Sequence, residues 1–262
     1  MNSKPTPAAI QVLTPQWPAP PHVQAAFTLR GGGVSTPPFD TLNVAAHVGD
    51  DREAVKENRR RIRAGLRLPA EPAWMEQVHG VQVLDLGVDQ TPGAAAAPGI
   101  PVADAAITRS AEHVCVVQVA DCLPVLFAVR DGSAVAAAHG GWRGLAAGVL
   151  EATVARLSVA PARLLAWIGP GIGVAHFEVG EDVRNAFLAH DSAAAGAFRG
   201  NANGRWQCDL VALAKARLVA LGITALFGGE WCTYADAAHF FSYRRDGRCG
   251  RMAALIWREE QP

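Results

Sequence analysis

The sequence has no excess of charge of either sign. Its 262 residues include 24 Lys plus Arg and 24 Asp plus Glu, so the formal net charge is zero. A neutral total argues against a domain that binds nucleic acid or a membrane surface over a whole face, because such domains carry a basic excess. A local basic pocket is still allowed. Its charge would come from arginine, because the only lysines are Lys4, Lys56 and Lys215.

Cysteine is also scarce. The five cysteines are odd in number, are scattered and form no Cys-x-x-Cys pair, which argues against a disulfide framework. The first twenty residues lack the apolar segment of a secretory signal, and no apolar run is long enough for a transmembrane helix. We therefore predict a soluble cytoplasmic protein without a membrane or nucleic-acid partner, either a monomer or a weak homo-oligomer.

The composition that remains is that of a globular protein. Half of the residues are hydrophobic and 18% are charged, and the length is ample for a core. Residues 1–22, rich in Pro and Ala, predict a loose lead-in, and no break in composition divides residues 23–262, which we assign to one catalytic domain. Hydrophobic patterning predicts strands at 23–30, 81–86, 114–119, 124–129, 133–138, 164–168, 223–227 and 251–257, and helices at 50–66, 145–157, 180–190 and 209–221.

The mixed order of these elements favours an α+β fold over a doubly wound sheet. Between them, residues 91–101 and 191–206 are predicted to be loops, and residues 243–247 a tight turn between two strands.

Three segments carry residues that suit chemistry, each next to a predicted strand. They are Gln-Val-His-Gly at 77–80, Ala-Asp-Cys-Leu-Pro at 120–124, and His-Gly-Gly-Trp-Arg-Gly at 139–144. His79, Cys122 and His139 offer two imidazoles and a thiolate, a set that suits Zn²⁺ with a fourth position for water. The same atoms also suit a nucleophilic Cys122 with His139 as its base and Asp121 or Asp104 as the orienting group. Spacing alone does not separate these two interpretations from buried packing residues.

Other residues near these segments are candidates for substrate binding. The glycine-rich turn before the helix and Arg143 could cradle an anion, and Arg30 beside the glycines at 31–33 is a second anion contact. The alternatives are an ordinary glycine-rich turn, which is common before helices, and a surface arginine. Asn43 and His47 either line the same pocket or cap the next helix, and Trp142, placed between glycines, could stack on a ligand ring.

In combination, and in their order, these motifs resemble the YfiH family of laccase-domain, multi-copper-polyphenol-oxidase-like proteins. The resemblance rests on FTLRGGGVS, LNVAAHVGD, EQVHG, ADCLPVLF, AAAHGGWRGLAAGVL, WIGPGIG, FEVG and FFSYRRDG, and runs from Phe27 to Trp257. Three departures stand out. The family's usual HAGWRG is HGGWRG here, its LNLG is LNVA, and Ala175-His176 replaces a frequent cysteine pair.

The resemblance implies an α/β/β/α layered fold, shared with deamidating toxins, and Zn²⁺ bound by His79, Cys122 and His139. It implies phosphorolysis of adenosine, inosine, guanosine and methylthioadenosine, and hydrolytic deamination of adenosine. Zinc would activate water for attack on C6 of the purine, with Asp121 or Asp104 as the acid. Arg30 and Arg143 would hold phosphate.

Three alternatives to this activity are kept. One is a Cys122-dependent or zinc hydrolase that removes L-serine from a UDP-muramyl peptidoglycan precursor, and another is a nucleotide-binding module without turnover. Copper-dependent polyphenol oxidation is disfavoured, because a multicopper oxidase needs a type 1 site and a trinuclear cluster, while only two of the eight histidines fall in the triad.

Overall fold

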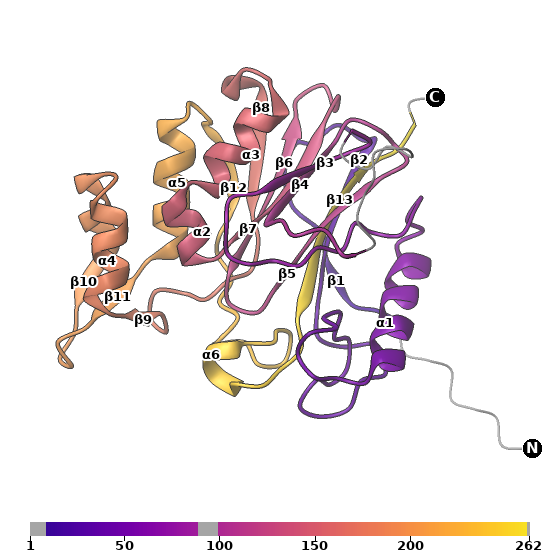
Figure 1. Cartoon of the computed structure of the whole chain (residues 1–262), viewed down its shortest axis with the longest axis horizontal. Helices are drawn as coiled ribbons and strands as arrows, with labels where there is room; N and C mark the ends of the chain where they lie inside the picture. The colour runs from indigo at the N-terminus through magenta and orange to yellow at the C-terminus, as the bar shows by residue number, and fades with distance from the viewer. Residues whose placement is uncertain (1–8, 89–98, 261–262) are drawn as a thin grey trace, which may run out of the picture.

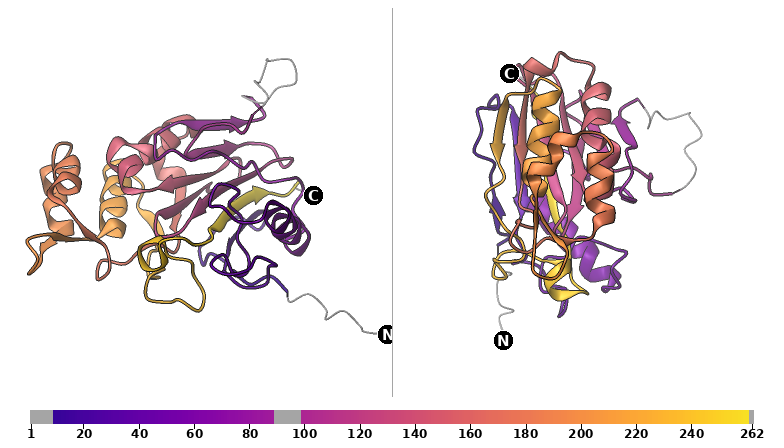
Figure 2. Two further views of the ribbon diagram at one scale, coloured as in Figure 1. Left: turned by 60° about the horizontal axis from the view of Figure 1, so that its bottom comes forward. Right: turned by 90° about the vertical axis from the view of Figure 1, so that its left-hand side faces the viewer.

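Two β-sheets packed face to face form the centre of the molecule (Figures 1 and 2). In this computed structural model, residues 9–88 and 99–260 are described. The smaller sheet has the order β1-β2-β13-β5, formed by Val12–Leu13, Val23–Thr28, Met252–Arg258 and Val114–Val119. The larger sheet has the order β12-β8-β6-β7-β4-β3, formed by Ala225–Gly228, Leu164–Ile168, Leu123–Val129, Val135–Gly140, Ala105–Thr108 and Val83–Leu86.

Helices cover the outer face of each sheet. Helix α1 (Arg52–Gly65), capped by Asp51, packs through Ile62 on the smaller sheet. Helices α2 (Trp142–Ala147), α3 (Val149–Leu157) and α5 (Leu210–Ala220) cover the larger sheet. The result is the α/β/β/α sandwich that the resemblance implied, and the α+β class is confirmed.

Strands β5, β6, β7 and β8 are buried along their whole length, which explains why they are nearly continuous apolar runs. Side chains alternate along a strand, so Met252, Ala254 and Ile256 of β13 enter the core between the sheets. Ala253, Leu255 and Trp257 point to the layer of α1. No described helix combines the length and the apolar character needed to cross a bilayer.

A smaller unit extends the helical side of the large sheet. It comprises α4 (Glu181–Leu188), a 3₁₀ helix at Ser192–Ala197, and the three-stranded sheet β10-β11-β9 (Phe198–Gly200, Trp206–Cys208, Glu178–Val179), seen at the left of Figure 1. The expectation of a loop over 191–206 is therefore wrong, because this segment forms a 3₁₀ helix and a hairpin. Most of the loop predicted at 91–101 lies outside the described residues.

Two other local expectations are corrected by backbone geometry. The helix predicted over 145–157 is divided by Gly148, whose φ of 102° is left-handed and ends α2 before α3 begins. The predicted turn at 243–247 is the short helix α6 (Tyr243–Asp246), because the Ser242 hydroxyl accepts a hydrogen bond from the Arg245 N–H and caps it. Strand β4 had no prediction, and β1 lies within the segment expected to be a loose lead-in.

Candidate metal centre and cavity

The hairpin of β6 and β7 brings Cys122 and His139 together. These strands pair antiparallel, with Leu123 opposite Gly140 and Pro124 opposite His139. Cys122 directly precedes β6, and His139 lies near the end of β7, so the two side chains meet at one end of the two middle strands of the larger sheet. The separation of 17 residues in sequence is therefore closed by a single hairpin.

His79 reaches the same place from a loop that a buried carboxylate organises. Asp104 accepts hydrogen bonds from the backbone N–H groups of Val78 (3.2 Å), His79 (2.9 Å) and Gly80 (2.7 Å). His79 has a φ of 60°, a left-handed conformation that costs energy for a non-glycine residue. The three N–H groups around one carboxylate compensate for this cost and fix the direction of the His79 side chain.

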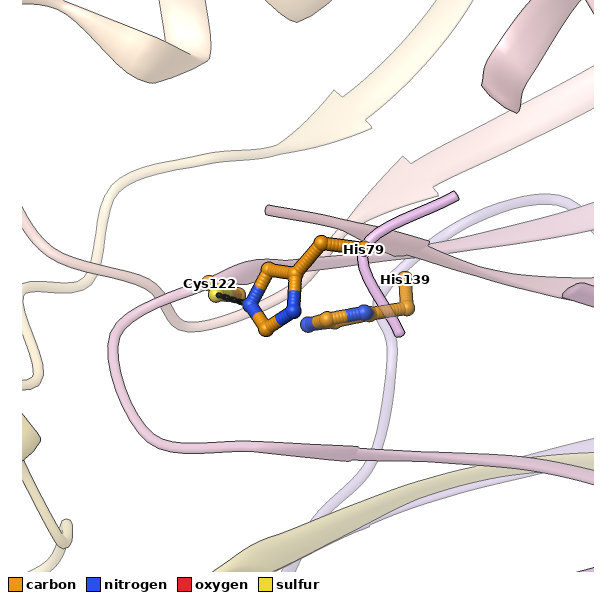
Figure 3. A group of neighbouring side chains, drawn as sticks. All are labelled: His79, Cys122 and His139. Atoms are coloured by element: carbon orange, nitrogen blue, oxygen red, sulfur yellow. Dashed lines mark hydrogen bonds between the residues drawn. The ribbon is translucent and has the colours of Figure 1, made fainter. Parts of the chain in front are cut away.

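The three side chains point toward one another (Figure 3). Their ligand atoms all lie within 4.8 Å of one another, and Cys122 Sγ is 3.8 Å from His79 Nε2. The two imidazole rings meet edge to face at a centroid distance of 4.8 Å. Gly141 makes this approach possible, because a Cβ there would lie 2.6 Å from His79 Cδ2 and 3.1 Å from Cys122 Sγ.

The charges around the triad favour a thiolate. Burial raises the pKa of Cys122, but the neighbouring His139 and His79 outweigh it and lower the pKa to about 6. Burial likewise lowers the pKa of His139, whereas the Cys122 thiolate and the Asp104 carboxylate raise it to about 9. The site therefore favours an anionic sulfur beside a positive charge.

Asp104 also orients His139. His139 Nδ1 lies 2.8 Å from Asp104 Oδ1, and the aspartate is fully buried. Burial raises the pKa of Asp104, but the hydrogen bonds from His139 and Gly80 lower it below its ordinary value, so it is an ionised acceptor. His139 must then donate from Nδ1, which leaves Nε2 as the ring's ligand atom.

This donor set could hold a metal ion. Two imidazole nitrogens and one thiolate, the latter with a lowered pKa, are what a tetrahedral zinc site with one open position uses. The histidine–carboxylate pair behind it is the usual support of a ligating imidazole. The residues present therefore fit a metal.

A cavity of about 490 Å³ opens over the triad. Of the sequence candidates, His47, Trp142 and Arg143 line it together with His79, Cys122 and His139. Sequence reasoning missed Gln77, Gln118, Tyr243 and Arg251, which line it as well. Gln118 is 6% exposed, and its Oε1 has no hydrogen-bond partner among the described residues. One residue of the cavity wall therefore has an acceptor that no described residue uses.

Comparison with known proteins places this geometry in a family. Residues 24–259 match the family described as multi-copper polyphenol oxidoreductase laccase. A protein of Pseudomonas aeruginosa named purine nucleoside phosphorylase is 51% identical to this chain, and the alignment covers 95% of this chain and 98% of the relative's length. The Escherichia coli purine nucleoside phosphorylase YfiH is 49% identical over 94% of this chain and 98% of its own length. The chain belongs to the YfiH family.

Solved structures agree with the assignment to the YfiH family. The crystal structure of a Neisseria meningitidis protein, 44% identical, superposes with a TM-score of 0.89 and covers 95% of this chain and 99% of its own. The family resemblance predicted from the motifs is thus confirmed.

Besides Asp104, which lies behind the triad, three sequence candidates lie outside the wall of the cavity. The Arg30 guanidinium donates to the carbonyls of Asp40 (3.1 Å) and Ala237 (2.9 Å) and packs on a phenyl ring. Asn43 is buried, and its amide bonds to Ala45 and Asp50. Both side chains are therefore occupied in holding loops together.

Asp121 is the third of these candidates. Its Oδ1 accepts from the Thr233 hydroxyl and its Oδ2 from the Arg244 N–H, each at 2.7 Å. These two bonds link the turn between β5 and β6 to the C-terminal segments that contain Thr233 and Arg244. The carboxylate is thereby directed to the C-terminal loops, whereas Asp104 is the carboxylate that contacts the triad.

At two of the three departures from the YfiH pattern, the structure shows what the residue present contacts. At Gly140 a Cβ would lie 2.9 Å from the Leu123 carbonyl oxygen, a close approach that glycine relieves. His176, which replaces part of the cysteine pair, stacks on the Tyr234 ring at 4.3 Å. Neither residue lines the cavity over the triad.

Proposed function

We propose that this protein is a zinc-dependent purine nucleoside phosphorylase that also deaminates adenosine. The observation that carries the proposal is the convergence of His79, Cys122 and His139 under one cavity whose wall bears an aromatic ring and arginines. The names of the P. aeruginosa and E. coli relatives support it. The proposed substrates are adenosine, inosine, guanosine and methylthioadenosine.

His79, Cys122 and His139 would hold the zinc ion. When bound, zinc supplies Lewis-acid chemistry and activates water, which is the requirement for deamination at C6 of adenosine. Asp104 keeps His139 in the tautomer that leaves Nε2 as ligand, and it holds the loop of His79 in place. With its pKa lowered below the ordinary value, Asp104 is an ionised positioning residue and not the acid.

The wall of the cavity would bind the nucleoside. Trp142 offers a ring for stacking on the purine, and the Arg143 guanidinium carbon lies 4.4 Å from the centre of that ring. Gln118 lines the cavity and its Oε1 has no hydrogen-bond partner among the described residues, so we propose it as an acceptor for a nucleoside donor. In phosphorolysis, a phosphate oxygen bonds to C1′ of the ribose while the C1′–N9 bond breaks, and the purine leaves with the electron pair and gains a proton.

Product analysis tests the proposal. Chelator-treated protein is reloaded with Zn²⁺ or Cu²⁺ and incubated with adenosine, with and without phosphate, and adenine and inosine are separated by chromatography. We expect adenine to form only with zinc and phosphate, and inosine to form with zinc alone. Cys122→Ala should abolish both activities, while Cys232→Ala, a second partly exposed free cysteine, should retain them. Unchanged adenosine with zinc-loaded protein would contradict the proposal.

The low pKa of Cys122 favours a second candidate, a thiolate-dependent hydrolase that releases L-serine from a UDP-muramyl precursor. A thiolate 3.8 Å from His79 Nε2 is the arrangement of a nucleophile beside an acid–base group. Hydrolysis that survives complete removal of metal would support this candidate over the phosphorylase. A reduced Cys122 is needed in either case, which is why we propose a cytoplasmic location.

A further inference from the structure

A second cavity adjoins the one over the triad. Its volume is about 270 Å³, and it shares His47, Tyr243 and Arg251 with its neighbour. The remaining lining residues are Val48, Gly247, Arg248 and Cys249. A ligand in the triad cavity and a ligand in this one would therefore lie side by side, separated by the same three side chains.

The walls of both cavities are positively charged. Arg143, Arg248 and Arg251 line them, and no Asp or Glu does so within residues 9–88 and 99–260. None of the three arginines forms an ion pair with a carboxylate in this part of the chain. The protein as a whole has a formal net charge of zero, so this is a local concentration of uncompensated charge.

Backbone contacts hold Arg248 and Arg251 in place without neutralising them. Arg248 Nη2 donates to the Gly49 carbonyl at 2.9 Å, and its guanidinium lies over Phe39. Arg251 Nη1 donates to the carbonyls at positions 249 and 250, and its backbone N–H donates to the Asn43 side chain at 2.9 Å. A guanidinium has five N–H donors, so each arginine keeps donors for a ligand.

His47 completes the wall between the cavities. Its partial burial and the charges of Arg251 and Arg59 lower its pKa below the ordinary value, so it is neutral at pH 7. A neutral imidazole still has one N–H to donate. The wall thus combines two guanidinium groups and an N–H, a donor set that matches the tetrahedral oxygens of a phosphate.

We propose that the cavity between Arg248 and Arg251 binds a phosphate group, while the triad cavity beside it holds the nucleoside. This inference rests on the proposed function, since phosphorolysis needs phosphate next to the ribose. The phosphate group is either inorganic phosphate or the 5′-phosphate of a nucleotide, because both present the same oxygens. In this arrangement the main phosphate contacts come from Arg248 and Arg251 of the C-terminal segment and not from Arg30, which donates to backbone carbonyls.

Direct binding of inorganic phosphate tests the proposal. Isothermal titration of the zinc-loaded full chain should show that Arg248→Gln weakens phosphate binding about tenfold, because one charge-assisted contact is lost. Arg248→Lys should recover part of the affinity. Arg199→Gln, which removes a charge from an exposed position of β10, should bind like the wild type. Arg248 is exposed in a loop, so its substitution leaves the core intact.

A parallel titration with adenosine 5′-monophosphate separates the two sources. Loss of affinity for inorganic phosphate identifies the cosubstrate site, and loss for the nucleotide alone identifies a nucleotide substrate. Either result supports the proposal, even if the wild type cleaves no nucleoside, in which case only the proposed function fails. Equal binding by Arg248→Gln and the wild type, or no binding of either probe by the wild type, would overturn it.

Discussion

His139 Nδ1 and Asp104 Oδ1 lie 2.8 Å apart, and both side chains are almost completely buried. The same carboxylate accepts three backbone N–H groups of the loop that carries His79. One side chain therefore positions two of the three candidate metal ligands, one from a strand and one from a loop.

Asp104→Asn should accordingly weaken metal binding without removing a ligand. An amide cannot accept all four hydrogen bonds as a carboxylate does, so we expect zinc affinity to fall about 10- to 100-fold. Competition with a chromophoric chelator measures this fall. Asp131→Asn, which alters an exposed carboxyl far from the triad, serves as the control. Equal zinc affinity of Asp104→Asn and the wild type would rule out the positioning role.

Gly141→Ala should disturb the triad by steric overlap. Its Cβ would approach His79 Cδ2 to 2.6 Å, so the loop or the ring must move. We expect a loss of stability of about 1–3 kcal/mol in urea unfolding and a loss of bound zinc. Gly196→Ala is the matched control, because a Cβ there meets nothing within 4 Å. A fully zinc-loaded Gly141→Ala protein would contradict the close packing at this point.

The thiol of Cys122 should react selectively in metal-free protein. With its pKa lowered to about 6 by the nearby histidines, it is mostly thiolate at pH 7, and its reactivity should fall as the pH drops through 6. Cys208, whose pKa is raised by burial to about 12, should stay unmodified. Iodoacetamide labelling followed by peptide mass spectrometry at several pH values measures both, and zinc should protect Cys122. A midpoint near the ordinary cysteine value would count against the thiolate.

Trp142→Ala should weaken nucleoside binding. Stacking on an aromatic side chain contributes about 1–3 kcal/mol per base, so we expect KM for adenosine to rise roughly 5- to 150-fold. Trp206→Ala is the matched control, since Arg184 lies over that ring at 4.4 Å, as Arg143 does over Trp142. An unchanged KM for adenosine would remove Trp142 from the binding site.

The elements with strong patterns could be predicted from the sequence. Buried strands such as β5 and β6 are uninterrupted apolar runs, and Asp51 marks the start of α1. The predicted helix failed at Gly148 because its apolar spacing continues through the break, and only the left-handed φ separates α2 from α3. Patterns of hydrophobicity do not record such changes of direction.

The residues of the candidate site that lie in short sequence motifs could be predicted, and the others could not. His79, Cys122 and His139 each follow or end a strand, and their meeting follows from the sheet. Gln118 and Arg251 lie in segments without a polar motif, and their place in the wall comes from contacts between distant parts of the chain. The glycines beside Arg30 favour an anion contact, but its guanidinium donates to backbone carbonyl groups.

The hairpin of β6 and β7 gives a bound metal a mechanical role as well. His139 lies in β7 and Cys122 directly precedes β6, the two middle strands of the six-stranded sheet, whereas His79 belongs to a loop outside the sheet. An ion shared by the three would cross-link that loop to the sheet in a protein whose five cysteines are all free. Zinc would thus be a reversible cross-link. Because it would bind the folded protein only, a higher concentration of free zinc would raise the melting temperature of the protein.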